Sequence, residues 1–239
     1  MSKVIHLKRI SYVLGVVFLI AGIFLTIWVI FAPIETFAET FNEYIGWLED
    51  LEQTIASAEN TFIIVLVLFM LFFIRASIPI IPTSILCVAT ALVFNFWQAL
   101  LINLAGVILL MIIKYYAGVH NGGGYIKYAV RLSSQADLAL KKNSSGATAT
   151  LFLLRLVPVV SLNMVSQLYG SYNYPLHKFL IASVAGYLPR IISYIVVGRN
   201  FTNPFSIGFV LPFGILFFIS GISLLIFTAV LNVIDLRKQ

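Results

Sequence analysis

The stretch that decides the fold is FLLRLVPVVSLNMVSQLYG, residues 152–170. The apolar segment that leads into it starts at Thr148 and meets Arg155 and then Pro158 long before the about 20 residues that a membrane span needs. Proline breaks the helical hydrogen-bond ladder, and small and polar residues then continue to Gly170. Within a membrane, broken backbone is tolerated only where protein covers it or a water-filled cavity meets it. The stretch therefore predicts a re-entrant hairpin.

A second stretch of the same kind lies upstream. The chain is apolar from Thr61 to Ile74, and Arg75, Pro79 and Pro82 then interrupt it before an apolar run resumes. Two prolines in the pattern Pro-Ile-Ile-Pro prevent a straight helix, because each lacks an N–H group and clashes with the preceding turn. We therefore expect a first re-entrant hairpin over residues 61–96.

The two stretches are related by one constant offset without a gap. The offset that places Arg75 on Arg155 also places Gly106 on Gly186 and Gly118 on Gly198. The predicted topology makes the first unit enter the membrane from outside and the second from inside. The sequence thus predicts an inverted repeat, an arrangement that places a binding site near the bilayer midplane.

The amino-acid composition indicates that most of this chain lies in a membrane. Of 239 residues, 61% are hydrophobic and 10% are charged, against the about 25% charge of a soluble domain. The net charge is +6, but the charged residues are too few and too scattered to form a nucleic-acid-binding surface. We predict an all-α integral membrane protein in which an extra transmembrane helix flanks the repeat at each end.

The distribution of charge predicts the topology. Lys3, Lys8 and Arg9 precede an apolar run over residues 10–34 that is too long for a cleaved signal peptide. Residues 35–59 carry seven acids and no Lys or Arg, so the positive-inside rule puts this segment outside and both termini in the cytoplasm. A bacterial plasma membrane is the expected location.

Four parts of the chain are expected. Residues 1–34 contain the first span, and 35–60 form an external amphipathic helix, which is either a partner-binding or lid element or a helix lying on the membrane surface or on the helix bundle. Residues 61–200 form the core, and 201–239 hold the last span and a basic tail. Full crossings are predicted at 98–116, 177–198 and 206–231, with a short interfacial helix over 125–140 in the cytoplasmic segment.

The predicted chemistry of the binding site rests on the arginines that interrupt the apolar segments. A guanidinium at the centre of a membrane helix costs about 2.5–3.5 kcal/mol on insertion scales unless it finds a partner or water. It suits bidentate phosphate binding, so Arg75 and Arg155 are candidates for a lipid phosphate. The alternative is that each arginine caps the exposed carbonyls of its own hairpin. Arg190, which follows Pro189, either donates to freed backbone or reaches the site.

The remaining candidates are polar or small. Asn163 and Gln167 share a helical face and either line a headgroup groove or satisfy broken backbone, while Lys114 and Lys178 are expected to extend to headgroups at span ends. The predicted substrate-binding set is Arg75, Pro79, Pro82, Arg155, Pro158, Asn163, Gln167 and Arg190. Gly106, Gly118, Gly186 and Gly198 are predicted close-packing positions.

Enzyme chemistry is not expected. The three histidines are far apart, the single cysteine, Cys87, supports neither a disulfide nor a thiolate cluster, and no Gly-x-Ser-x-Gly elbow occurs. No metal site and no cofactor are predicted. The expected partners are membrane lipids with phosphate headgroups, and the sequence leaves a homo-oligomer open.

The pattern resembles the DedA superfamily, also called VTT-domain or SNARE-associated Golgi proteins. The resemblance rests on residues 152–158, the small and polar run to Gly170, residues 179–186 and the closing Gly198-Arg199, with Pro79–Pro82 and Gly106 upstream. It implies two re-entrant hairpins that meet tip to tip and lipid translocation: phospholipid scrambling in eukaryotic members, recycling of undecaprenyl phosphate in some bacterial ones.

This chain departs from that pattern in two respects. Ser161 stands where many members carry a second arginine, and no Asp or Glu occurs between Glu59 and Asp137. Carboxylate-mediated proton coupling is therefore not expected, and the chain is similar to the Golgi-type and bacterial branch that lacks those acids. A lipid translocase that follows gradients is the leading hypothesis. A secondary transporter of a small solute or ion and a membrane scaffold that binds partners through the external helix are the alternatives.

Overall fold

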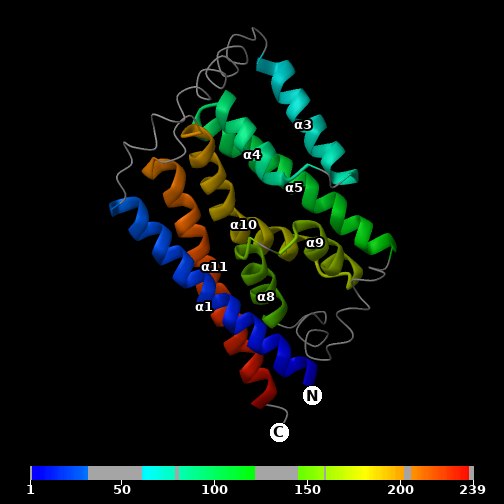
Figure 1. Ribbon diagram of the computed structural model, residues 1–239. Helices are drawn as coiled ribbons and strands as arrows, with labels where there is room; N and C mark the ends of the chain where they lie inside the picture. Colours follow the sequence, from blue (N-terminus) through cyan, green and yellow to red (C-terminus); the bar gives the residue numbers. More distant parts are fainter. Residues whose placement is uncertain are drawn as a thin grey trace. The chain divides into compact units, whose positions relative to one another are not determined.

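The computed structural model describes residues 2–31, 61–78, 81–121, 145–158, 160–201 and 206–236 (Figure 1). The predicted external helix in 35–59, the predicted interfacial helix in 125–140 and Pro79 lie outside these residues. The described residues form helices and contain no strand. The helices are α1 (Ser2–Phe31), α3 (Thr61–Ser77), α4 (Thr83–Val93), α5 (Phe96–Asn121), α8 (Ser145–Leu156), α9 (Leu162–Ser171), α10 (Leu176–Arg199) and α11 (Ile207–Leu236).

Four of the described helices contain segments long and apolar enough to cross a membrane. These segments are Arg9–Trp28 in α1, Phe96–Asn121 in α5, Leu176–Arg199 in α10 and Ile207–Ala229 in α11. They contain or largely overlap the four crossings expected from the sequence. The predicted fold class, an all-α integral membrane protein, is confirmed.

The other four helices form two interrupted pairs, as the two proline-containing stretches predict. Helices α3 and α4 flank the first break, and α8 and α9, of 12 and 10 residues, flank the second. In both pairs the second helix begins after an extended residue: Pro82 has φ −62° and ψ 137°, and Ser161 has φ −65° and ψ 128°. The chain therefore leaves helical geometry at closely corresponding places.

The repeat extends to the helix boundaries. Helix α5 begins at Phe96 and α10 begins at Leu176, and the offset that carries Arg75 onto Arg155 carries one start onto the other. The Asn95 side chain caps α5 by accepting a hydrogen bond from the Gln98 amide at 3.0 Å. The backbone carbonyls of Asn95 and of the equivalent Pro175 accept matching bonds, from the Ala99 and Phe179 amides, each at 2.9 Å.

The chain divides into two compact units. Unit 1 comprises residues 1–21, 111–189 and 216–239, and unit 2 comprises residues 22–110 and 190–215. Unit 1 thus holds the α8–α9 pair and unit 2 the α3–α4 pair. Unit 1 contains the N-terminal part of α10 and the C-terminal part of α5. Unit 2 contains the N-terminal part of α5 and the C-terminal part of α10. An inverted repeat predicts that each unit contains opposite ends of these two long helices.

Within unit 1, glycines let helices approach closely. A Cβ atom at Gly118 in α5 would lie 2.1 Å from the Gln167 carbonyl oxygen in α9, and one at Gly170 would lie 2.0 Å from the Tyr115 carbonyl oxygen. A Cβ at Gly186 in α10 would lie 2.7 Å from the Phe152 carbonyl oxygen in α8. Backbone approach at this distance requires glycine.

The glycines of unit 2 occupy equivalent contacts. A Cβ at Gly106 in α5 would lie 2.5 Å from the Phe72 ring of α3, and one at Gly198 in α10 would lie 2.8 Å from the Val88 carbonyl oxygen of α4. In both units, therefore, the glycine of the long helix faces the interrupted pair.

Helices α1 and α11 lie side by side in unit 1 (Figure 1). A Cβ at Gly221 would lie 2.8 Å from the Gly15 carbonyl oxygen, and the hydroxyls of Ser11 and Thr228 are 2.8 Å apart and hydrogen-bonded. Small residues and hydroxyl bonds are the usual means of helix association in lipid, where burial of apolar surface gives little driving force.

We predict that Gly118→Ala destabilises the protein strongly, because the new methyl group meets backbone that cannot turn aside. Overpacking typically costs about 1–3 kcal/mol, and a contact to backbone belongs at or above the upper end. The apparent melting temperature in detergent measures the effect. Gly15→Ala is the matched control, since its Cβ would come no closer than 3.2 Å to the Leu225 side chain and 3.3 Å to the Gly221 carbonyl oxygen. Equal melting temperatures for the two variants would contradict the packing described here.

Candidate functional site

The buried centre of unit 1 is Arg155, in the last turn of α8. Its side chain is 2% exposed. The guanidinium donates hydrogen bonds through Nη1 to the Leu162 carbonyl oxygen at 3.0 Å, through Nη2 to the Ser166 hydroxyl at 2.8 Å, and through Nε to the Ser183 hydroxyl at 3.3 Å. It also lies 5.6 Å from the centre of the Phe179 ring. One side chain thus joins α8 to α9 and α10.

These partners of Arg155 are neutral. Residues 145–189 contain no Asp or Glu, and the Ser166 hydroxyl is itself held by a 2.8 Å bond to the Leu162 carbonyl oxygen. Hydroxyl and carbonyl dipoles solvate the guanidinium, and the Phe179 ring adds a cation–π contact. The geometry contains the capping interaction that the sequence left as an alternative, since Arg155 bonds a carbonyl of its own hairpin.

The carbonyls at the end of α8 receive donors from α11. A helix that ends at Leu156 leaves its last carbonyls without intrahelical partners. The Ser223 hydroxyl donates to the Leu153 carbonyl oxygen at 2.8 Å, and the Ser220 hydroxyl donates to the Leu156 carbonyl oxygen at 3.1 Å. Protein hydroxyls therefore satisfy two of the last four carbonyls of α8, as the low dielectric of a membrane favours.

The first interrupted pair uses different residues at the equivalent place. Asn103 in α5 is fully buried, donates to the Cys87 carbonyl oxygen at 3.2 Å, and accepts a 2.5 Å bond from the Thr90 hydroxyl. The repeat places Asn103 on Ser183. In both repeats, a buried polar residue of the long helix therefore bonds the interrupted pair.

Unit 2 also holds two buried arginines, Arg75 at 8% and Arg190 at 5% exposure. The Nε atom of each is buried without a hydrogen bond, although both residues make other interactions. Arg155, Asn163 and Gln167 belong to unit 1 instead. The predicted arginines therefore fall into two groups, one in each unit.

The other predicted residues lie around the breaks. Asn163 and Gln167 are half-buried on α9, Pro158 is half-buried in the turn after α8, and Pro82 is exposed before α4. Sequence reasoning did not select Ser166 and Ser183, which hold Arg155. The signal for Ser183 was its equivalence in the repeat to Asn103, the one polar residue in the otherwise apolar stretch 99–113.

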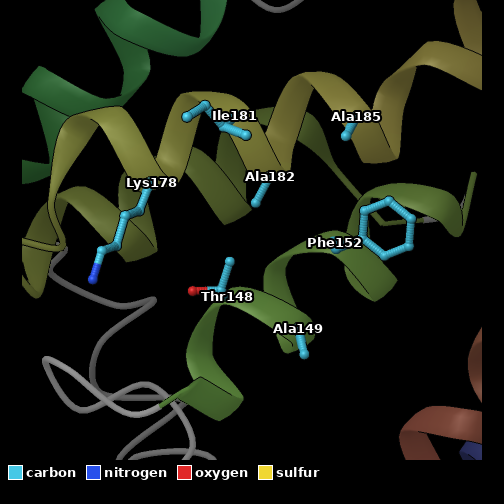
Figure 2. A pocket seen from close by; sticks show the side chains of 7 residues that line it. All are labelled: Thr148, Ala149, Phe152, Lys178, Ile181, Ala182 and Ala185. Atoms are coloured by element: carbon cyan, nitrogen blue, oxygen red, sulfur yellow. The ribbon is translucent and has the colours of Figure 1, made fainter.

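An open groove of about 610 Å³ lies between α8 and α10 in unit 1. Its lining residues are Thr148, Ala149, Phe152, Lys178, Ile181, Ala182 and Ala185. Figure 2 shows Lys178 and Thr148 at one end and Phe152 and Ala185 at the other. The groove therefore has one polar end and one apolar end.

We predict that Arg155→Lys destabilises the protein, because an ammonium group cannot span the three acceptors that the planar guanidinium reaches. Each hydrogen bond lost from a charged group costs about 1.5–3 kcal/mol. Unfolding in detergent, followed by circular dichroism, measures the loss. Arg199→Lys is the control, since Arg199 is exposed at the end of α10 and surface substitutions change stability by about 0.5 kcal/mol or less. Equal losses would show that the three bonds do not hold the hairpin.

The comparisons with known proteins agree with this architecture. Residues 81–200, half of the chain, match the VTT domain. The chain is also similar to the protein YqeD of Bacillus subtilis (strain 168), which is described as uncharacterized, with 24% identity over 139 residues that cover 57% of this chain and 67% of the relative. No solved structure matches the chain. The resemblance drawn from the two arginine- and proline-containing stretches is confirmed: the chain belongs to the VTT-domain family.

Proposed function

We propose that the chain translocates membrane lipids with phosphate headgroups. The observation that carries the proposal is Arg155, a guanidinium 2% exposed in an interrupted helix pair and bonded there to hydroxyls and a carbonyl. Family membership supports a membrane transport role, since re-entrant hairpins and lipid translocation are what the VTT resemblance implies. The phosphate as ligand is our inference from the chemistry of arginine.

The energetics favour a phosphate at this place. Neutral dipoles solvate a cation less well than water does, so the buried guanidinium keeps an affinity for an anion. In the bonds to Ser166 and Ser183 only the guanidinium is charged, whereas a phosphate is also charged and accepts two parallel bonds from one guanidinium. A phosphate that replaces the two hydroxyls therefore adds the attraction between opposite charges and neutralises the buried cation.

The proposed cycle is an exchange of partners. When the α8–α9 pair moves away from α10, the headgroup reaches Arg155, and the released serine hydroxyls bond backbone carbonyls or water. Asn163 and Gln167, half-buried on α9, offer amide groups to the remaining polar part of the headgroup. The acyl or prenyl chains stay in hydrocarbon throughout, so no covalent step is needed.

The first hairpin has an equivalent role in the proposal. Arg75 occupies the position equivalent to Arg155, in the last turn of α3, and Arg190 lies in the same unit. We propose that each arginine-bearing hairpin binds the headgroup at one stage of its passage across the membrane. Passage in either direction then follows the lipid gradient, because no intramembrane carboxylate is available between Glu59 and Asp137 to couple it to protons.

The test is leaflet exchange in proteoliposomes that contain a headgroup-labelled phospholipid or polyprenyl phosphate. We expect the wild-type protein to accelerate exchange, and Arg155→Gln and Arg75→Gln to slow it roughly tenfold each, the rate change that about 1.4 kcal/mol of lost stabilisation produces. Arg199→Gln, which removes an exposed charge, should leave the rate unchanged. Gel filtration and circular dichroism establish that each variant is folded.

A labelled glucosylceramide separates phosphate recognition from a general defect, because its headgroup is polar but carries no phosphate. Arginine variants should slow the phospholipid more than the glycolipid. Exchange that is equal in wild type and in both folded arginine variants would refute the phosphate mechanism. Uptake of a small solute without lipid exchange would favour the secondary transporter, and capture of a partner by residues 35–60 with neither activity would favour the scaffold.

A further inference from the structure

The groove between α8 and α10 differs from the Arg155 centre in exposure and in chemistry. Arg155 is buried, whereas the groove is open and includes Lys178 and Ile181, the latter 70% exposed. Its volume of about 610 Å³ falls within the about 300–1,000 Å³ of small-molecule sites. A molecule can therefore occupy the groove without any rearrangement of the buried arginine.

The polar end of the groove suits an anion. The Lys178 ammonium is exposed, and the half-buried Thr148 lies across from it on α8 (Figure 2). The Thr148 hydroxyl hydrogen-bonds the Tyr174 hydroxyl, which fixes its position. A hydroxyl can donate one bond and accept others, so Thr148 and Lys178 together offer a charged donor and a polar contact.

The apolar end of the groove suits a hydrocarbon chain. Phe152 on α8 is 37% exposed, and Ala182 and Ala185 present small side chains on α10. From Lys178 to Ala185 the groove follows α10 for about 10 Å, at about 1.5 Å per residue. A phosphate at Lys178 would thus place the first part of one lipid chain against Phe152 and Ala185.

The first repeat carries different residues at the equivalent positions. Thr148, Ala149, Lys178 and Ala182 correspond in the first repeat to Leu68, Phe69, Gln98 and Ile102. Three of these replacements are bulkier and apolar, and the fourth removes the charge. The aromatic side chain differs as well, since Phe72 is fully buried against Gly106 whereas its counterpart Phe152 lines the groove.

We propose that this groove is a one-sided loading site for a membrane lipid, with the phosphate at Lys178 and Thr148 and one chain along Phe152 and Ala185. The site serves the leaflet at the N-terminal ends of α8 and α10, which is the cytoplasmic leaflet in the predicted orientation. The proposal rests on the proposed function and adds an asymmetry to it: the second repeat selects phosphate lipids before they reach the arginine, and the first repeat lacks that selection.

The test measures binding alone. The full-length protein in maltoside micelles receives phosphatidylglycerol with a photoreactive group in one acyl chain, and mass spectrometry locates the labelled peptides after illumination. We expect the label on residues 148–152 and 178–185. Diacylglycerol with the same photoreactive chain, which lacks the phosphate, should label these residues several-fold less.

Two matched substitutions sharpen the test. Lys178→Gln introduces the residue that the first repeat carries and should weaken labelling roughly fivefold, the scale of one exposed ion pair. Ala185→Trp should abolish groove labelling by filling the apolar end, whereas Ala105→Trp, at the equivalent exposed position of α5, should not affect it. Equal labelling in wild type, Lys178→Gln and Ala185→Trp, or equal labelling by the phosphate-free lipid, would overturn the loading site.

Binding and translocation can fail separately. Groove labelling without leaflet exchange in proteoliposomes would support the loading site and contradict the proposed translocation. Leaflet exchange that persists unchanged in Lys178→Gln, with no groove labelling, would overturn the loading site and leave the translocation proposal standing.

Discussion

A helix that ends inside a membrane leaves carbonyl groups without intrahelical partners, and no water is available to bond them. This constraint accounts for several buried polar residues of unit 1. Ser220 and Ser223 donate to carbonyls of the last turn of α8, and Arg155 joins that helix to α9 and α10 through three hydrogen bonds. Side-chain donors that would contribute little to the stability of a soluble protein thus become necessary for folding here, because an unbonded carbonyl in hydrocarbon costs several kcal/mol.

The same arrangement explains how a structural residue can serve a transport function. In the proposed mechanism a phosphate replaces the serine partners of Arg155, so the interaction that joins α8 to α9 and α10 is also the one that the headgroup uses. The glycines at the helix contacts keep the long helices close to each interrupted pair. The two repeats then diverge at the positions of the groove, where the second carries Lys178 and small residues and the first carries Gln98 and larger ones.

Much of this fold can be predicted from the sequence because charge and proline are rare in apolar segments and therefore informative. Arg155 and Pro158 mark one break and Arg75 marks the other, and the offset between the two arginines matches the starts of α5 and α10. The partners of Arg155 could not be predicted. A serine such as Ser183 is common in membrane helices, and only the packing of α10 against α8 shows which hydroxyl meets the guanidinium. The groove could not be predicted either, because it depends on the side-chain volumes of two packed helices. The periodicity of apolar residues along the sequence does not report those volumes.

The most direct measurement of the central claim is the rate at which wild-type protein exchanges a headgroup-labelled phospholipid between leaflets, as a function of protein copies per vesicle. If the arginine-bearing hairpins carry headgroups, the fraction of vesicles with rapid exchange rises with the copy number. This fraction saturates when every vesicle holds protein. An exchange rate that equals that of protein-free vesicles at all copy numbers, with correctly folded and inserted protein, would contradict the account.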